Sequence, residues 1–176
     1  MIPARESLRP RRARSTSTVA GFTLIELSIV VFIISVLAAL AVPALKQVML
    51  ESQSTAVAND LRVFRDAFAD YAHEHGDWPP EGGQPGEFPA GMAGRLGKIN
   101  WERVTPIGGR YQWAPGSLHQ GERYRAAIVI ASLDGNNVSS DRRQLEDLDR
   151  RIDDSDLEAG NFRLGYRNFP VFVIEH

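Results

Sequence analysis

The sequence predicts an α+β protein in which one long N-terminal helix lies on a small antiparallel sheet. Three observations predict this class. Residues 22–75 contain no glycine and a single proline, the second half of that stretch has an amphipathic pattern, and residues 76–176 alternate turn signals with short apolar runs. The chain has 176 residues, of which 43% are apolar, and this is enough for one core of ordinary size.

Residues 1–21 form a basic leader. It carries five arginines against the single acidic residue Glu6, whereas the rest of the chain has 15 basic and 21 acidic residues, a net charge of −6. An acidic remainder argues against nucleic acid as the principal partner. The chain has no cysteine, which excludes disulfides, thiolate nucleophiles and cysteine-ligated metals.

Residues 22–45 form a candidate transmembrane helix, because Glu26 is the only ionisable side chain in this range. A helix of this length rises about 36 Å, which exceeds the roughly 30 Å of a hydrocarbon core. The arginines precede the segment and most of the chain follows it. The positive-inside rule therefore predicts a single pass with a cytoplasmic N-terminus.

Residues 46–75 continue the helix with an amphipathic pattern. Apolar side chains recur three or four residues apart at Val57, Leu61, Phe64, Phe68 and Tyr71, with charged residues between them. This stripe is expected to cover the globular part. The helix is expected to kink at Pro43 and to end at Gly76.

Residues 76–176 are expected to form the globular α+β region. Residues 76–97 are rich in Gly and Pro and indicate a loop with short turns. Strands are predicted on both sides of a Gly108-Gly109 turn, over the apolar run at 123–133, and once or twice within 161–175. A helix with Leu145, Leu148 and Ile152 at helical spacing is expected in between, capped by Ser139 or Ser140.

The apolar segment at residues 21–40 admits three interpretations. It could be a secretory signal, with Ala39-Leu40-Ala41 as a cleavage site before Val42, or it could be a plain membrane anchor. Neither interpretation gives Glu26 a purpose, although a carboxylate in a membrane segment is costly and usually marks function.

The third interpretation follows from the run G-FTLIELSIVVFIISVLAALAVPAL, which resembles the type IV pilin and type II secretion pseudopilin family. The resemblance implies that a prepilin peptidase cuts between Gly21 and Phe22 and that Phe22 becomes the N-methylated terminus. It also implies that Glu26 is the assembly glutamate and that Pro43 is the helix-interrupting proline of the family. A pilin-like fold is then expected.

The resemblance also implies partners and a location. A carboxylate in the bilayer is stabilised by a cationic partner, and the new N-terminal amine of a neighbouring subunit supplies one. The expected partners are other pilin or pseudopilin subunits, a prepilin peptidase, an inner-membrane assembly platform and membrane lipid. The globular part is expected on the periplasmic side of a bacterial inner membrane.

A looser resemblance to the major pseudopilin extends over GDWPP, TPIGGRYQWAPG and ASLDG. In those relatives a terminal loop holds calcium, which would place the ion here at Asp134 and Asp141. Calcium favours such oxygen ligands. An Asp-Gly turn followed by a helix cap explains the same residues without an ion, and we favour that interpretation. No cofactor is therefore expected to be required.

The chain is not expected to be an enzyme, because it lacks G-x-S-x-G and any other recognisable catalytic motif. The resemblance implies a structural function instead. The leading hypothesis is a type II secretion pseudopilin, and the alternative is a type IV pilus subunit for adhesion, motility or DNA uptake. A membrane-anchored ligand-binding module is the rival from another class. It would use aromatic residues of the segment 76–113, although aromatics beside turns are usually core. These residues are Trp78, Trp101, Tyr111 and Trp113.

Overall fold

The computed structural model describes residues 21–119 and 122–176. The predicted leader, residues 1–21, therefore lies outside the described residues apart from Gly21. The chain divides into two compact units, residues 1–42 and residues 43–176. Helix α1 (Leu24–His75) contributes to both units.

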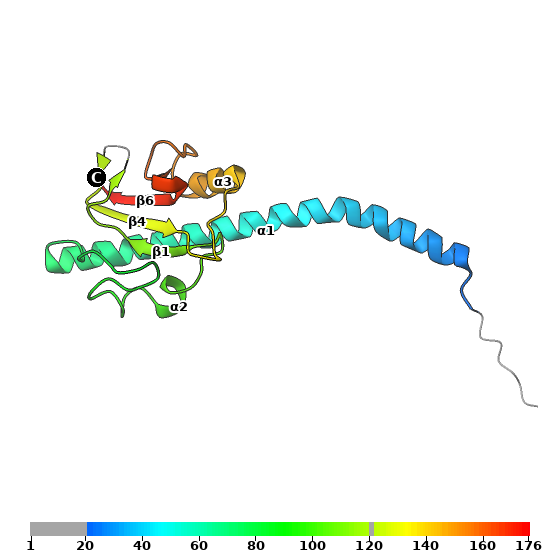
Figure 1. Ribbon diagram of the computed structural model, residues 1–176, viewed down its shortest axis with the longest axis horizontal. Helices are drawn as coiled ribbons and strands as arrows, with labels where there is room; N and C mark the ends of the chain where they lie inside the picture. The colour runs from blue at the N-terminus through cyan, green and yellow to red at the C-terminus, as the bar shows by residue number, and fades with distance from the viewer. Residues whose placement is uncertain (1–20, 120–121) are drawn as a thin grey trace, which may run out of the picture. The chain divides into compact units, whose positions relative to one another are not determined.

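The second unit contains a four-stranded antiparallel sheet beside the C-terminal part of α1 (Figure 1). The strand order is β1-β4-β6-β5. The bounds are β1 (Arg110–Trp113), β4 (Ala126–Ala131), β5 (Phe162–Leu164) and β6 (Pro170–Glu175). A second, two-stranded sheet consists of β2 (Leu118–His119) and β3 (Glu122–Arg123). The α+β fold class predicted from the sequence is confirmed.

The central strand β4 is buried on both faces. Ile128 and Ile130 face the core shared with α1, whereas Ala127 packs with Val171 and Val173 in a smaller cluster on the other side. A strand covered on both faces has an uninterrupted apolar sequence rather than an alternating one. This explains why the run AAIVIA was the clearest strand signal in the chain.

The C-terminal half of α1 supplies the other side of the main core. Val57, Leu61, Phe64 and Phe68 are all fully buried, which confirms the predicted apolar stripe. Phe68 stacks on Trp113 with ring centroids 3.9 Å apart. The amphipathic pattern therefore indicates a helix whose apolar stripe packs into the core of the globular unit.

Asp60 differs from its sequence-based expectation. It is one of the charged residues between the stripe residues, which the amphipathic pattern places on the polar face, yet it is only 7% exposed. Its Oδ2 accepts hydrogen bonds from the Arg103 guanidinium at 2.7 Å and from the Tyr111 hydroxyl at 3.0 Å. These partners compensate for the burial of the carboxylate, and they join α1 to β1 and the preceding loop.

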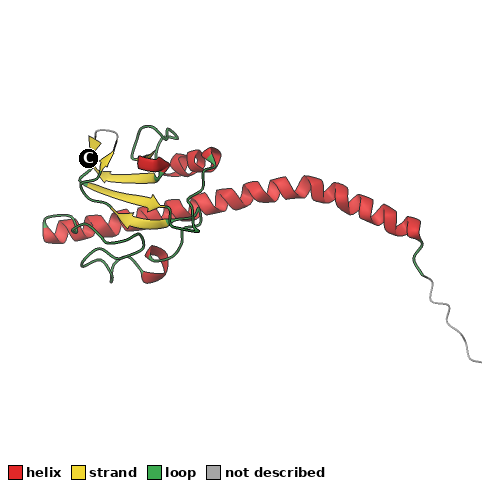
Figure 2. Cartoon of the chain, viewed as in Figure 1, coloured by secondary structure: helices red, strands yellow, loops and turns green. Residues whose placement is uncertain are grey.

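The segment between α1 and β1 is mostly loop, as predicted, with a short helix α2 (Lys98–Trp101) (Figure 2). The strand expected before Gly108-Gly109 was wrong, because the described residues there form α2 and a turn. The Trp101 indole N–H donates to the Glu87 carbonyl at 2.8 Å, and the Gly108 N–H donates to the Thr105 carbonyl at 2.9 Å. Loop contacts therefore replace the expected hairpin.

Helix α3 (Arg142–Ile152) was predicted, but its cap is not Ser139 or Ser140; it is Asp141, for which a helix cap was the favoured alternative to calcium binding. The N-cap is Asp141, whose side chain accepts a hydrogen bond from the Arg143 N–H at 3.0 Å. The expected Ser139 plays a secondary role, because its hydroxyl accepts from the Asp141 N–H at 3.3 Å. Aspartate is as good an N-cap as serine, so sequence preference alone did not separate these positions.

Candidate functional site

The first turn of α1 forms a capping box at Thr23 and Glu26. The Thr23 N–H and hydroxyl both donate to Glu26 Oε2, each at 2.9 Å. In return, the Glu26 N–H donates to Thr23 Oγ1 at 3.3 Å. This reciprocal pattern satisfies backbone donors that would otherwise lack partners at the start of a helix.

The capping box gives Glu26 a structural role that the sequence analysis missed. The signal was present, because Thr23-Leu24-Ile25-Glu26 is a T-x-x-E sequence directly before an apolar run. The positive end of the helix dipole also favours a carboxylate in this turn. Glu26 is therefore held at the helix terminus, beside the predicted cleavage position.

The surface around Glu26 is apolar and uncovered. Phe22 is 82% exposed and Leu24 is 83% exposed, and the apolar side chains that follow also face outward. Ser28 and Ser35 do not interrupt this surface, because each hydroxyl donates to the carbonyl four residues earlier. Among the described residues, α1 is the one helix long and apolar enough to cross a membrane.

Gly21 and Pro43 bound this segment. A Cβ at Gly21 would meet nothing within 4 Å, so packing in this structure does not require a glycine there. Pro43 lies inside α1, at the first residue of the second unit. A proline in a helix interior removes a backbone hydrogen bond. The cleavage at Gly21 and Phe22, the methylation of Phe22 and the kink at Pro43 stay predictions.

Asp134 and Asp141, the candidate calcium ligands, have local structural roles. Asp134 lies in a tight turn in which Leu133 and Asn136 exchange backbone hydrogen bonds and Gly135 has a φ of +78°. Asp141 is the N-cap of α3. These are the turn and the cap that we favoured, and calcium binding by this pair stays a prediction.

The aromatic residues proposed for a binding platform are mostly core. Trp101, Tyr111 and Trp113 are each at most 1% exposed, and Trp78 is half-buried. The Trp113 indole N–H donates to the Pro79 carbonyl at 2.9 Å. These three rings cannot stack on a ligand at the surface, so the observation that would have favoured a ligand-binding module does not hold.

The fold and the terminal segment together define a pilin-like chain, with a long apolar helix and a small antiparallel sheet. Residues 16–42 match the family model described as prokaryotic N-terminal methylation motif. The chain is also 39% identical over 66 residues to the fimbrial protein EcpC of Eikenella corrodens, over 38% of this chain and 43% of that protein.

The chain carries the N-terminal methylation motif of type IV pilins and pseudopilins, and the resemblance predicted from its sequence is confirmed over these residues. The match covers less than half the length of the curated relative. The motif ends at residue 42, where the first compact unit also ends.

Proposed function

We propose that this protein is a structural subunit of a pilus-like filament, of the type II secretion pseudopilin kind, and that it is not an enzyme. A prepilin peptidase cuts it between Gly21 and Phe22, and Phe22 is then methylated. Before assembly, the helix at residues 22–45 anchors the chain in the inner membrane and the globular unit is periplasmic. The proposed assembly partners are other pilin-type subunits and an inner-membrane platform.

The observation that carries this proposal is the setting of Glu26. It is the only ionisable residue between Phe22 and Leu45, it lies in the first turn of α1, and apolar side chains surround it. A helix cap alone does not need a charge, since glutamine also serves in a capping box. A carboxylate retained in a lipid-facing helix indicates a cationic partner.

The new N-terminus of a neighbouring subunit supplies that cation. Cleavage after Gly21 creates an amine at Phe22, and pairing with Glu26 of the adjacent subunit would set the axial register of the filament. The capping contacts with Thr23 already fix the carboxylate at the helix end. Less side-chain entropy is then lost when the pair forms.

Lateral packing of the apolar helices supplies the cohesion. Exposed fractions are 64% for Ile25, 55% for Leu27 and 52% for Ile29. Side chains this exposed are stable in lipid, but outside it they need cover from other apolar surfaces. Bundling with further copies provides that cover, because water makes apolar contact favourable.

A type IV pilus subunit for adhesion, motility or DNA uptake is the second candidate. It is favoured by one observation, the partial identity to a protein named as fimbrial. The pseudopilin assignment is favoured by the order of the GDWPP, TPIGGRYQWAPG and ASLDG segments and by the absence of cysteine. Both candidates use the same processing and the same role for Glu26.

The test separates the charge of Glu26 from its capping role. Glu26→Gln keeps the capping box but removes the charge, whereas Thr23→Ala weakens the cap and keeps the charge. In a host with a prepilin peptidase and an assembly system, we expect Glu26→Gln to reduce the sheared filament fraction at least tenfold. Thr23→Ala is expected to reduce it much less.

Glu51→Gln is the matched control, because Glu51 is an exposed glutamate further along the same helix. It should assemble as the unmodified chain does. Normal assembly of Glu26→Gln, with the same yield as Glu51→Gln, would contradict the register role. Equal losses in Glu26→Gln and Thr23→Ala would assign the defect to the helix cap instead.

A further inference from the structure

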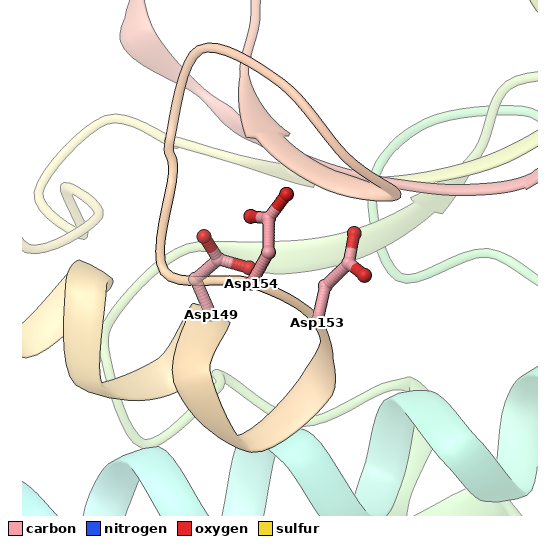
Figure 3. A group of neighbouring side chains, drawn as sticks. All are labelled: Asp149, Asp153 and Asp154. Atoms are coloured by element: carbon pink, nitrogen blue, oxygen red, sulfur yellow. The ribbon is translucent and has the colours of Figure 1, made fainter.

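Three aspartates meet at the C-terminal end of α3. Asp149 lies in the last turns of α3, and Asp153 and Asp154 are the first two residues after the helix ends at Ile152. Each offers a carboxylate oxygen, and these oxygens all lie within 4.8 Å of one another. Figure 3 shows the three side chains pointing to the same side, into the loop that leads from α3 to β5.

Asp149 is fully buried, with an exposed fraction of 0%. Neither of its carboxylate oxygens has a hydrogen-bond partner among the described residues. A buried carboxylate normally has partners, because its transfer from water is otherwise very costly. Burial, followed by the charges of Asp154, Asp153 and Asp156, raises the pKa of Asp149 to about 7, against a smaller lowering by the nearby Asp154 backbone N–H.

The other two carboxylates are oriented by backbone donors of the following loop. The Asn161 N–H donates to Asp153 Oδ2, and the Asp156 N–H donates to Asp154 Oδ1 at 2.9 Å. Each carboxylate therefore keeps a second oxygen available as a ligand. These contacts fix two exposed side chains next to a buried one.

Gly160 keeps the space beside these oxygens open. A Cβ at this position would collide with Asp153 Oδ2 and would lie 3.1 Å from Asp154 Oδ2. Gly160 also has a φ of +70°, which residues other than glycine rarely adopt. The loop thus passes close to the carboxylates without filling the gap between them.

No arginine or lysine within residues 21–119 and 122–176 forms an ion pair with the three aspartates. The nearest arginines on α3, Arg150 and Arg151, pair with Asp147 instead, at 3.7 and 3.0 Å. The Arg163 guanidinium donates to the Gly160 carbonyl at 2.8 Å. Within the described part of the chain, the three converging carboxylates therefore have no ion-pair partner from a protein side chain.

We propose that Asp149, Asp153 and Asp154 bind a hard divalent cation, and we assign calcium to the site. Calcium lies 2.3–2.6 Å from its oxygen ligands, so two ligands of one ion can be at most about 5 Å apart. The three carboxylate oxygens lie within 4.8 Å of one another, which is inside this limit. The site is distinct from the pair Asp134 and Asp141, and it does not depend on filament assembly.

The ion would join the end of α3 to the loop before β5. Because calcium binds the folded arrangement and not the unfolded chain, it stabilises the fold by mass action. Thermal unfolding of the full chain in detergent micelles, in EDTA and then in excess calcium, measures this effect. We expect the midpoint to rise by roughly 5 °C or more in calcium. Equilibrium dialysis with radioactive calcium should give one ion per chain.

Asp149→Asn and Asp154→Asn test the ligands, because asparagine keeps the shape and removes the charge. Each variant is expected to bind calcium at least tenfold more weakly and to lose most of the midpoint shift. Asp134→Asn is the matched control and should respond to calcium as the unmodified chain does. Asp154 is exposed, so that variant is expected to fold even where Asp149→Asn does not.

Two results would overturn the proposal. The first is an unchanged midpoint together with no bound calcium, which would leave Asp149 as a buried, protonated carboxyl group. The second is a calcium response that is lost in Asp134→Asn and kept in Asp154→Asn, which would place the ion in the Asp134 loop. Saturation by magnesium at the same concentration as calcium would contradict the assignment of calcium.

Discussion

Replacement of Phe64 by alanine tests whether the second half of α1 belongs to the globular core. Phe64 is fully buried, and its ring meets Trp101 and Tyr111 edge to face, with centroids 5.0 and 4.9 Å away. Buried Phe→Ala substitutions cost about 3–5 kcal/mol, and each aromatic pair contributes about 1 kcal/mol of such a loss. We therefore expect Phe64→Ala to lower the free energy of unfolding by about 4 kcal/mol.

Val63 provides the control, because it is adjacent in sequence but 57% exposed. Val63→Ala should change the free energy of unfolding by no more than about 0.5 kcal/mol. Urea unfolding of the full chain in mild detergent, followed by tryptophan fluorescence, measures both variants. A cost below about 1 kcal/mol for Phe64→Ala, or equal costs for the two variants, would refute the packing of α1 described above.

Three further outcomes are expected. Asp141→Ala should lower stability by about 1 kcal/mol because it removes the N-cap of α3, whereas Ser140→Ala should have almost no effect in the same urea titration. Burial, and then the neighbouring Asp60 carboxylate, raises the pKa of Tyr111 above its usual value. The unfolded chain therefore loses this proton first, so the contribution of Tyr111 to stability should be constant below about pH 10 and fall by up to about 1.4 kcal/mol per pH unit above it. A Tyr111→Phe variant with the same alkaline slope would contradict this. Asp60→Ala leaves the Arg103 guanidinium and the Tyr111 hydroxyl without their acceptor. It should lower the free energy of unfolding by about 2 kcal/mol, measured by thermal or urea unfolding.

The helix and the central strand could be predicted from the sequence because their patterns are strong. Apolar residues recur with a period of 3.6 from Val57 to Phe68, which indicates a helix, and the unbroken apolar run of β4 indicates a buried strand. The segment 98–109 could not be predicted in the same way, because α2 is only four residues long and depends on distant contacts. Its Trp101 is held by the Glu87 carbonyl, which no local pattern indicates.

The candidate sites show the same division. Glu26 was recognisable because a lone carboxylate in an apolar helix is a local and unusual feature. Its capping partner Thr23 was also within reach, through the T-x-x-E sequence. The burial of Asp149 could not be predicted, because Asp149 belongs to a run of charged residues that is typical of a solvated helix end. Only the path of the loop through Gly160 brings the aspartates together.

The most direct test of the filament proposal is the intact mass and N-terminal sequence of the chain purified from membranes of a host with a prepilin peptidase. We predict a chain that starts at Phe22 and carries one added methyl group on its terminal amine. A chain that starts at Val42 would identify an ordinary secreted domain. An uncut chain in the presence of active peptidase would identify a static anchor, and either result would contradict the proposed function.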